Sequence, residues 1–307
     1  MTAVTRLSTI PISVPLEAPK GGTGHPLGPT FLTHCLVKVE TDAGVTGFGE
    51  ISDGWGCEYA HVADAIVTEA LARFISRGVR AAKVRLGVKW QEELTTLAEL
   101  HKAFGPGITI FIDGNEAFTP KTAARIAPRL AECGVGFFEE PCPRDDRVGL
   151  ARLVAGSPVP IAYGEHVFGL AGFLELAEER LADIWQPDAA ICGGMSELRK
   201  IAALAAARGF RLSPHSAGTP IGLAANLHAA SGAPALAWLE MGARMDELAP
   251  AFVGGANVST QMIVDGMLRP PAGPGIGVEP GPDHAERYPY RVPPPVRTAP
   301  ALYQGSI

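Results

Sequence analysis

From residue 78 onward the chain alternates short apolar runs with longer stretches whose apolar residues recur at helical spacing. TAARIAPRLAEC (122–133) and GMSELRKIAALAAARG (194–209) are two such helical stretches. Strands that alternate with helices in this way indicate βαβ units and a parallel sheet. The apolar runs that we predict as strands are VRAAKV (79–84), ITIFID (108–113), GVGFFEE (134–140), VPIAYGE (159–165), DIWQPD (183–188), FRLSPH (210–215) and LAWLE (236–240).

The first 76 residues and the last 67 differ from this pattern. HCLVKVETDAGVTGFGE (34–50) alternates apolar and polar positions around a turn at 42–44, which predicts a β-hairpin. Residues 58–76 carry apolar residues at helical spacing and predict a helix. Residues 241–307 are rich in glycine and proline. We expect that segment to return over the N-terminal part and to fray at its end.

A polar residue stands where each predicted strand stops. From Arg85 onward the intervals between these residues are 28, 26, 26, 23, 27 and 25. One strand, one helix and two loops need about 24 residues, so each interval is one βα unit. In a β/α barrel the carboxyl ends of the strands meet at one mouth, where barrel active sites lie. The residues are Lys83, Arg85, Asp113, Glu139, Glu165, Asp188, His215 and Glu240.

Composition excludes several classes of protein. The chain is 47% hydrophobic and 19% charged, which is globular rather than disordered or fibrous. A net charge of −6 without a basic run argues against nucleic acid or a membrane surface as partner. No apolar run approaches the ~18 residues of a membrane span, and the N-terminus lacks a signal-like apolar core. The five cysteines form no C-x-x-C pair, so we expect reduced thiols in a cytoplasmic protein.

The acids and the histidine at the predicted mouth suggest metal-assisted chemistry. Asp113, Glu139 and Glu165 would repel one another unless a cation lay among them, and oxygen ligands favour Mg²⁺, here one ion per chain. The alternative is that these carboxylates lie apart on a solvated rim. Asp188 and His215 follow the next two strands, and we expect them to form a hydrogen-bonded dyad in which the carboxylate orients the imidazole. A structural histidine is the alternative for His215, and a helix N-cap is the alternative for Asp188.

Other polar residues extend this candidate site. Lys83 and Arg85 lie two apart on one strand, so both point into the mouth. Glu240 reaches a substrate oxygen from the remaining side. Asn115 shares the face of Asp113 and binds substrate or stabilises a turn. His166 follows Glu165 directly and faces either the mouth or a neighbouring loop.

The motifs around these residues resemble the mandelate racemase branch of the enolase superfamily, over nearly the whole chain. The resemblance implies an α/β fold: a modified TIM-type (β/α) barrel with a small α+β N-terminal capping domain completed by the C-terminal segment. We expect the capping domain at 1–70, the barrel at 71–245 and the returning segment at 246–307. The motifs are GVTGFGE (44–50), AAKVRLG (81–87), IDGNEAF (112–118), FFEEP (137–141), YGEH (163–166), QPDAAICGG (186–194), SPH (213–215), WLE (238–240) and GPGIGVE (273–279).

The resemblance also implies roles for single residues. It makes Asp113, Glu139 and Glu165 the Mg²⁺ ligands and His215, oriented by Asp188, a general acid/base. Lys83 aligns with the first lysine of the family's K-x-K pair, which contacts the substrate carboxylate, and Glu240 bonds a substrate oxygen. His25 lies in an N-terminal loop that shapes specificity in the family, although a surface histidine is the alternative. The implied partners are a small carboxylate substrate and further copies of the chain.

Two departures from the family pattern bear on the reaction. Arg85 replaces the second lysine, and arginine is a poor base because it stays charged. We therefore expect a dehydratase that converts a sugar acid to a 2-keto-3-deoxy acid. The alternatives are a racemase or epimerase of a hydroxy or amino acid, and a shortened non-catalytic homologue. Residues 51–82 form a shorter stretch than in relatives, which leaves open whether the barrel has its first strand.

Overall fold

A computed structural model describes most of the chain from residue 77 onward and parts of the N-terminal region. The predicted helix at 58–76 and His25 lie outside the described residues. Within the described part, no helix is long and apolar enough to cross a membrane. The described residues are 4–15, 31–41, 46–51, 77–87, 90–104, 107–216, 218–242, 245, 249–253 and 262–289.

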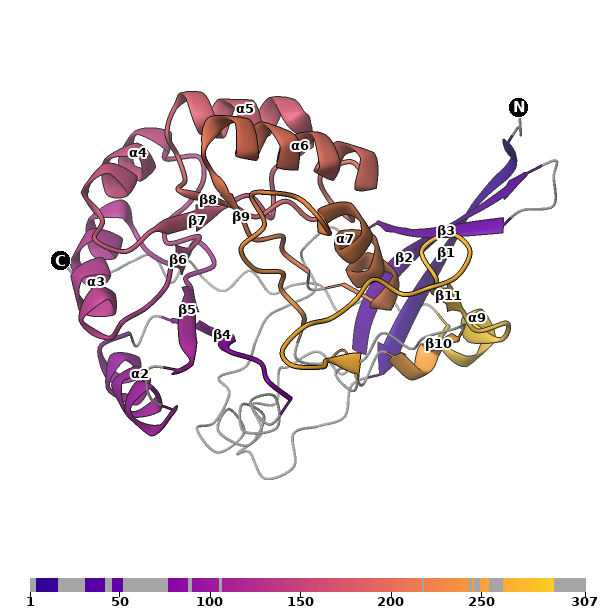
Figure 1. The fold of residues 1–307 in the computed structure, drawn as a ribbon, viewed down its shortest axis with the longest axis horizontal. Coiled ribbons are helices and arrows are strands. Elements are labelled where there is room, and N and C mark those ends of the chain that lie inside the picture. Colours follow the sequence, from indigo (N-terminus) through magenta and orange to yellow (C-terminus); the bar gives the residue numbers. More distant parts are fainter. Residues whose placement is uncertain are drawn as a thin grey trace.

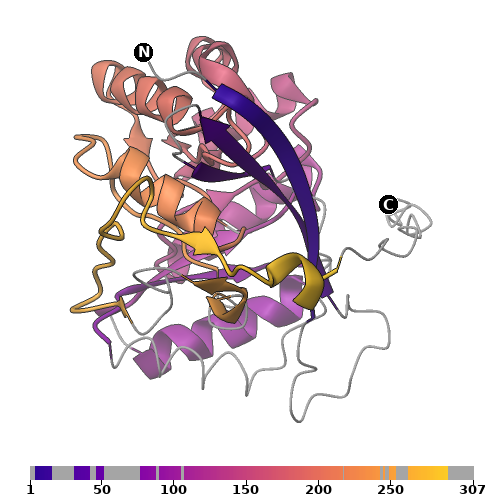
Figure 2. The same cartoon turned by 90° about the vertical axis from the view of Figure 1, so that its right-hand side faces the viewer.

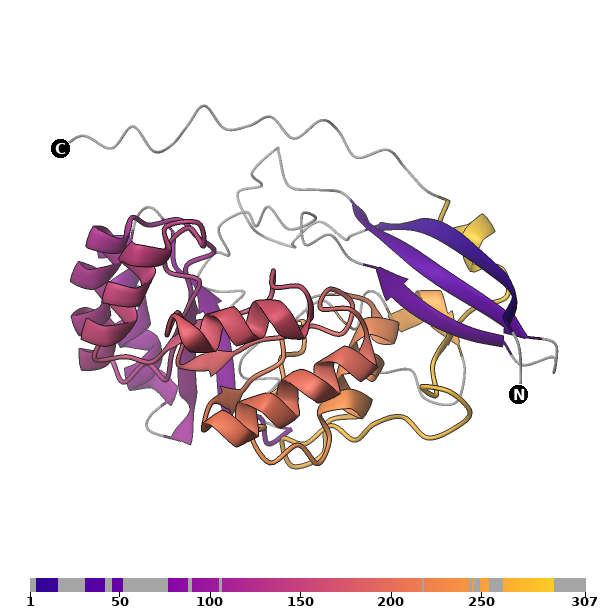
Figure 3. The ribbon, with the colours of Figure 1, turned by 90° about the horizontal axis from the view of Figure 1, so that it is seen from above.

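An antiparallel three-stranded sheet forms the N-terminal part of the molecule. It consists of β1 (Val4–Pro15), β2 (Phe31–Thr41) and β3 (Thr46–Ile51), in the order β1-β2-β3. β2 and β3 pair antiparallel, with Leu36 opposite Glu50, which confirms the predicted hairpin. The sheet lies to one side of the remaining strands and helices, next to α7 (Pro220–Ala230) (Figures 1 and 3).

A six-stranded parallel sheet forms the centre of the larger part. Its strand order, β4-β5-β6-β7-β8-β9, follows the chain, as predicted from the alternating pattern. The helices lie in an arc outside these strands (Figure 1). The strands are β4 (Ala81–Arg85), β5 (Thr109–Asp113), β6 (Phe138–Glu139), β7 (Ile161–Tyr163), β8 (Ile184–Trp185) and β9 (Arg211–Leu212). Among the described residues, the helices that precede α7 are α2 (Trp90–Phe104), α3 (Pro120–Glu132), α4 (Arg147–Gly156), α5 (Gly169–Glu178) and α6 (Met195–Arg208).

The run at 236–240 is a strand only in part. Leu236 forms a single parallel bridge with Leu212 of β9. Beyond it, the backbone N–H of Ala237 donates to Leu212 (2.8 Å) and that of Glu240 donates to Pro214 (3.1 Å). These bonds are enough to lay the run beside β9. They place Glu240 at the carboxyl end of the strands although the ladder itself is short.

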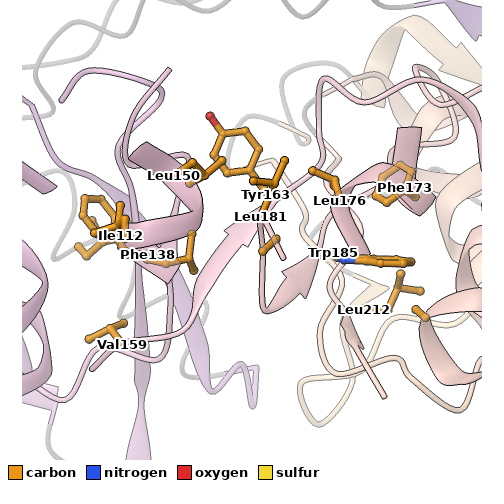
Figure 4. Close-up of a cluster of buried hydrophobic side chains, with 14 of the residues drawn as sticks. Ile112, Phe138, Leu150, Val159, Tyr163, Phe173, Leu176, Leu181, Trp185 and Leu212 are labelled. Carbon is orange, nitrogen blue, oxygen red and sulfur yellow. The ribbon is translucent and has the colours of Figure 1, made fainter. Parts of the chain in front are cut away.

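Hydrophobic side chains fill the space between the strands and the outer helices. Phe138, Tyr163 and Trp185 are almost completely buried, and they pack with Leu150 of α4 and Phe173 of α5 (Figure 4). Each large apolar side chain removed from water contributes about 1.5–3 kcal/mol. This layer therefore holds the helices onto the strands and fixes where the strands end.

A second, smaller cluster lies on the inner face of the strands. Phe111 and Phe137 stack with ring centroids 4.0 Å apart, and Trp238 meets Phe111 edge-on at 5.5 Å. Because side chains alternate along a strand, Asp113 and Glu139 share this inner face two residues further on. The aromatic cluster is therefore the floor beneath the two carboxylates.

The C-terminal segment returns to the N-terminal sheet. Its strands β10 (Phe252–Val253) and β11 (Glu279–Pro280) pair antiparallel, after the 3₁₀ turn Ala249–Ala251. β11 contacts β3, and α9 (His284–Arg287) contacts β1 (Figure 2). The described part of the segment thus lies where the glycine- and proline-rich pattern placed it.

Candidate active site

Strand register brings the first polar residues into one row. Arg85 of β4 lies opposite Asp113 of β5, and Asp113 lies opposite Glu139 of β6. Glu165 follows β7 after Gly164, whose φ of +135° is accessible mainly to glycine. A Cβ at Gly164 would lie 3.0 Å from the backbone nitrogen of Gln186, so a side chain there would disturb the adjacent strand.

The ammonium group of Lys83 lies among the carboxylates. Its Nζ is 2.6 Å from Glu139 Oε1, 2.8 Å from Glu240 Oε1 and 3.9 Å from Asp113 Oδ2. Burial lowers the pKa of Lys83, but the surrounding carboxylates outweigh that effect and raise it well above its usual value. Lys83 therefore stays charged, and it links β4 to the run that lies beside β9.

Glu139 is the most deeply buried of the predicted ligands. Burial raises its pKa, Lys83 opposes that effect, and the neighbouring Asp113 and Glu240 carboxylates raise the pKa further, well above the usual value. Gln186 Nε2 donates to Glu139 Oε2 at 2.5 Å and fixes the carboxylate. We did not predict a role for Gln186. The signal in the sequence that could have found it is its position, because a polar side chain directly follows the buried strand β8.

The two oxygens of Glu165 face different neighbours. Oε2 lies 3.7 Å from His215 Nε2, and Oε1 lies 3.6 Å from His166 Nδ1. Burial raises the pKa of Glu165, but His215 and Lys83 dominate and lower it to about 2. Glu165 is therefore ionised, and its two oxygens contact His215 and His166.

The predicted ligands fit a hard divalent cation by their chemistry. Asp113 and Glu165 lie close enough to Glu139 for their charges to raise its pKa, and all three side chains are buried. Such a cluster needs positive charge, which Lys83 supplies here in part. The three are more widely spread than Glu140, Glu165 and His166, the group of described residues whose ligand atoms all lie within 4.8 Å of one another. The Lys83 ammonium contacts both Asp113 and Glu139.

His215 and Asp188 form the predicted dyad. His215 Nδ1 lies 2.8 Å from Asp188 Oδ2, which leaves Nε2 directed toward Glu165 and Glu240. Burial lowers the pKa of His215, but the Glu165 and Glu240 carboxylates and the Asp188 hydrogen bond raise it well above the usual value. The imidazole is thus oriented to exchange a proton at Nε2 on the side of the carboxylates.

Asn226 holds the dyad in place, and we did not predict it. Its Nδ2 donates to Asp188 Oδ1 (2.9 Å) and to the His215 carbonyl (3.1 Å), and its Oδ1 accepts from Ala189 N (2.8 Å). The side chain is fully buried on α7. The one amide side chain within the mostly apolar helix PIGLAANLHAA was the signal that could have found it.

Arg85 and Asn115 lie at the edge of the carboxylate row. The Arg85 guanidinium donates to Asp113 Oδ2 (3.0 Å) and to Asn115 Oδ1 (2.8 Å). Asn115 has a φ of +41°, and its backbone N–H donates to Asp113 Oδ1 (2.8 Å). Together they fix both oxygens of Asp113. Asn115 thus has the turn conformation that was one of its two expected roles, and its role in binding substrate stays a prediction.

His166 contacts two glutamates. Its Nδ1 lies 2.9 Å from Glu140 Oε1 and 3.6 Å from Glu165 Oε1. His25, the remaining predicted site residue, lies outside the described residues. The structure thus gathers Lys83, Arg85, Asp113, Glu139, Glu165, Asp188, His215 and Glu240 into one connected set of side chains.

Comparisons with known proteins agree with this architecture. The chain is 33% identical over 213 residues to the D-galactarolactone cycloisomerase of Agrobacterium fabrum, covering 66% of this chain and 55% of that protein. It is 32% identical over 207 residues to the arabinonate dehydratase of Saccharolobus solfataricus, covering 67% and 54%. The matches thus span about half the length of these curated relatives.

Solved structures show the same fold. A racemase from Streptomyces coelicolor A3(2) with bound magnesium superposes with a TM-score of 0.76 at 21% identity, covering 93% of this chain and 99% of that one. The family model described as "Enolase C-terminal domain-like" matches residues 65–284. The chain therefore belongs to the enolase C-terminal domain-like family, in the mandelate racemase branch of the enolase superfamily.

Proposed function

We propose that this protein is a Mg²⁺-dependent dehydratase of a sugar acid, which removes the proton next to a carboxylate and then eliminates a hydroxyl group. The observation that carries the proposal is the His215–Asp188 dyad, whose Nε2 faces the carboxylate cluster 3.7 Å from Glu165 Oε2. Relatives named arabinonate dehydratase and D-galactarolactone cycloisomerase support a sugar-acid substrate.

Asp113, Glu139 and Glu165 would hold the magnesium ion. When bound, the ion would supply Lewis-acid stabilisation of the negative charge that develops on the substrate carboxylate. Lys83 would add a second positive charge beside the same carboxylate, because its ammonium stays protonated between Glu139 and Glu240. Buried, pre-oriented charges of this kind stabilise a transition state without reorganising during the reaction.

His215 would carry out both proton transfers. The deprotonated form of His215 would take the proton from the carbon next to the carboxylate at Nε2, while Asp188 stabilises the resulting imidazolium at Nδ1. The same Nε2–H then protonates the departing hydroxyl group, which leaves as water. The resulting enol tautomerises to a 2-keto-3-deoxy acid, so the substrate loses one water and no oxidant is needed.

Arg85 favours a single-base reaction over two-base racemisation. It stands where a second lysine base would be needed, and its guanidinium is bonded to Asp113 and Asn115. Arginine cannot be deprotonated in a protein at ordinary pH. We therefore place all proton transfer on the His215 side of the substrate.

A screen of aldonic and aldaric acids with Mg²⁺ tests the proposal, with formation of a 2-keto acid as the readout. We expect His215→Asn to lower turnover by about 10²–10⁴, the usual contribution of a placed acid-base group. The matched control is His101→Asn on α2, which should keep wild-type turnover. Failure of the whole screen to yield a 2-keto acid would overturn the dehydratase.

Cycloisomerisation is the second candidate function, because the relative from Agrobacterium fabrum is named a D-galactarolactone cycloisomerase. It would use the same proton abstraction but expel a lactone oxygen instead of a hydroxyl group. Incubation with sugar lactones in D₂O separates the two reactions. Ring opening without loss of an oxygen atom identifies the cycloisomerase, and incorporation of deuterium without any elimination identifies a racemase or epimerase.

A further inference from the structure

The carboxylate of Glu116 joins segments that belong to three consecutive strands. Glu116 lies three residues beyond the end of β5, and it has no role in the reaction proposed above. Its Oε1 accepts a hydrogen bond from the backbone N–H of Arg144 (3.0 Å), in the loop after β6. The same oxygen accepts a hydrogen bond from the hydroxyl of Tyr163 (3.2 Å), the last residue of β7. One carboxylate oxygen therefore connects β7 to the loops that follow β5 and β6.

Tyr163 presents its hydroxyl at this position because packing fixes its ring. The side chain is 1% exposed and belongs to the hydrophobic layer between the strands and the helices, and its hydroxyl oxygen lies at the edge of that cluster (Figure 4). The hydroxyl also contacts the Cys142 carbonyl, in the loop after β6, at 2.5 Å. A buried tyrosine hydroxyl needs polar partners of this kind. Tyr163 thus ties β7 to the loop after β6 both directly and through Glu116.

The backbone around Glu116 adopts a conformation that needs support from its surroundings. Asn115 has a φ of +41° and Glu116 a φ of +59°, in the left-handed region that glutamate rarely occupies. The N–H of Glu116 donates to the Glu140 carbonyl (2.7 Å), which turns the loop toward β6. Residues in this region persist only where other contacts hold them there. The hydrogen bonds from Arg144 and Tyr163 to the carboxylate are contacts of this kind.

Each of the three connected segments carries one proposed magnesium ligand. Asp113 ends β5 and Glu139 ends β6. Glu165 lies two residues beyond Tyr163. A shift of one segment against the others would therefore change the distances between the ligands. Mg²⁺ tolerates little change of this kind, because it demands near-octahedral geometry with oxygen ligands at about 2.0–2.1 Å. The contacts of Glu116 are thus placed to control the geometry of the site.

We propose that Glu116 and Tyr163 are positioning residues that set the spacing of Asp113, Glu139 and Glu165 for a magnesium ion. The inference rests on the magnesium site of the proposed function and assigns it two further residues. They act through the ligands rather than on the ion, because Tyr163 packs on the helix side of the strands, whereas Asp113 and Glu139 face the inner side. Groups that orient metal ligands typically contribute about 10–100-fold to metal affinity.

The test is calorimetric titration of the metal-free full chain with Mg²⁺, and the readout is the dissociation constant. We expect Glu116→Ala and Tyr163→Phe each to raise this constant by about 10–100-fold. Glu116→Gln should bind with near wild-type affinity, because its amide oxygen still accepts both hydrogen bonds. The matched controls are Glu178→Ala, at an exposed acid at the end of α5, and Tyr288→Phe, in the C-terminal segment. Both should bind Mg²⁺ as wild type does.

Two outcomes overturn the inference, and they differ in what they imply for the magnesium site. Wild-type affinity in folded Glu116→Ala and Tyr163→Phe would overturn the positioning role and leave the metal site intact. A wild-type chain that binds no Mg²⁺ would overturn the metal site and the positioning role with it. Urea unfolding of each variant separates lost affinity from lost stability. Tyr163→Phe removes a single oxygen atom, so it decides the test if Glu116→Ala does not fold.

Discussion

Asn226 is the residue on which the geometry of the dyad depends most, and Asn226→Ala should reveal that dependence in both stability and turnover. Its fully buried amide donates hydrogen bonds to Asp188 and to the His215 carbonyl. It also accepts one hydrogen bond from the backbone N–H of Ala189. Alanine removes all three bonds. It leaves a buried carboxylate with fewer donors and orphans two backbone groups.

The magnitude follows from these contacts. A hydrogen bond to a charged group contributes about 1.5–3 kcal/mol and a neutral one about 0.5–1.5 kcal/mol. One charged and two neutral bonds predict a loss of about 2.5–6 kcal/mol in the free energy of unfolding. Asp188 keeps its bond from Ala190 N (2.9 Å), so the dyad is loosened rather than abolished. We therefore expect turnover to fall by about 10- to 100-fold, as for other residues that orient a functional side chain.

Urea unfolding followed by circular dichroism measures the first effect, and the acid-sugar assay measures the second. Ser231→Ala is the control, because this exposed hydroxyl bonds only the Leu227 carbonyl at the end of the same helix. It should cost no more than about 1 kcal/mol and leave turnover unchanged. A loss below about 1 kcal/mol in Asn226→Ala, or unchanged turnover in a folded variant, would refute the role that we assign to this amide.

Two further substitutions test other parts of the account. Lys83→Met leaves the buried Glu139 and the partly buried Glu240 without their shared cation, which should cost about 3–5 kcal/mol in the metal-free protein. Added Mg²⁺ should then raise the melting temperature of Lys83→Met more than that of wild type, and an equal rise in both would contradict the arrangement. Gly164→Ala should cost about 2 kcal/mol in urea unfolding, because its φ is +135° and the new Cβ would lie 2.9 Å from Phe173. Gly156→Ala at the end of α4, where nothing lies within 4 Å, is the control and should stabilise the protein by about 0.5 kcal/mol.

The positions of the strands could be predicted because each βα unit has nearly the same length. Asp113 and Glu139 end their strands at the same register level, so constant spacing in sequence becomes adjacency in space. The run at 236–240 was predicted as a full strand, but only Leu236 forms a bridge with β9. An apolar run in the sequence predicts that its residues are buried beside a strand. It does not predict how many of these residues form the backbone hydrogen bonds of the sheet.

The supporting groups could not be predicted in the same way. Asn226 reaches Asp188 from 38 residues away, through a helix whose rotation relative to the strands is set by packing. The direction of His166 depends on the backbone at Gly164, where a positive φ interrupts the alternation of the strand. Regular strand geometry therefore gave no basis for choosing between the mouth and the neighbouring loop. The contact with Glu140 became visible only in three dimensions.

The central claim is that Asp113, Glu139 and Glu165 hold a magnesium ion beside His215. Calorimetric titration of the metal-free chain with Mg²⁺ tests it most directly, with Asp113→Asn compared against the exposed control Glu178→Gln. The account predicts one binding event in wild type and in Glu178→Gln, and none in Asp113→Asn. Binding of Mg²⁺ to Asp113→Asn with wild-type affinity, or no binding to wild type, would contradict it.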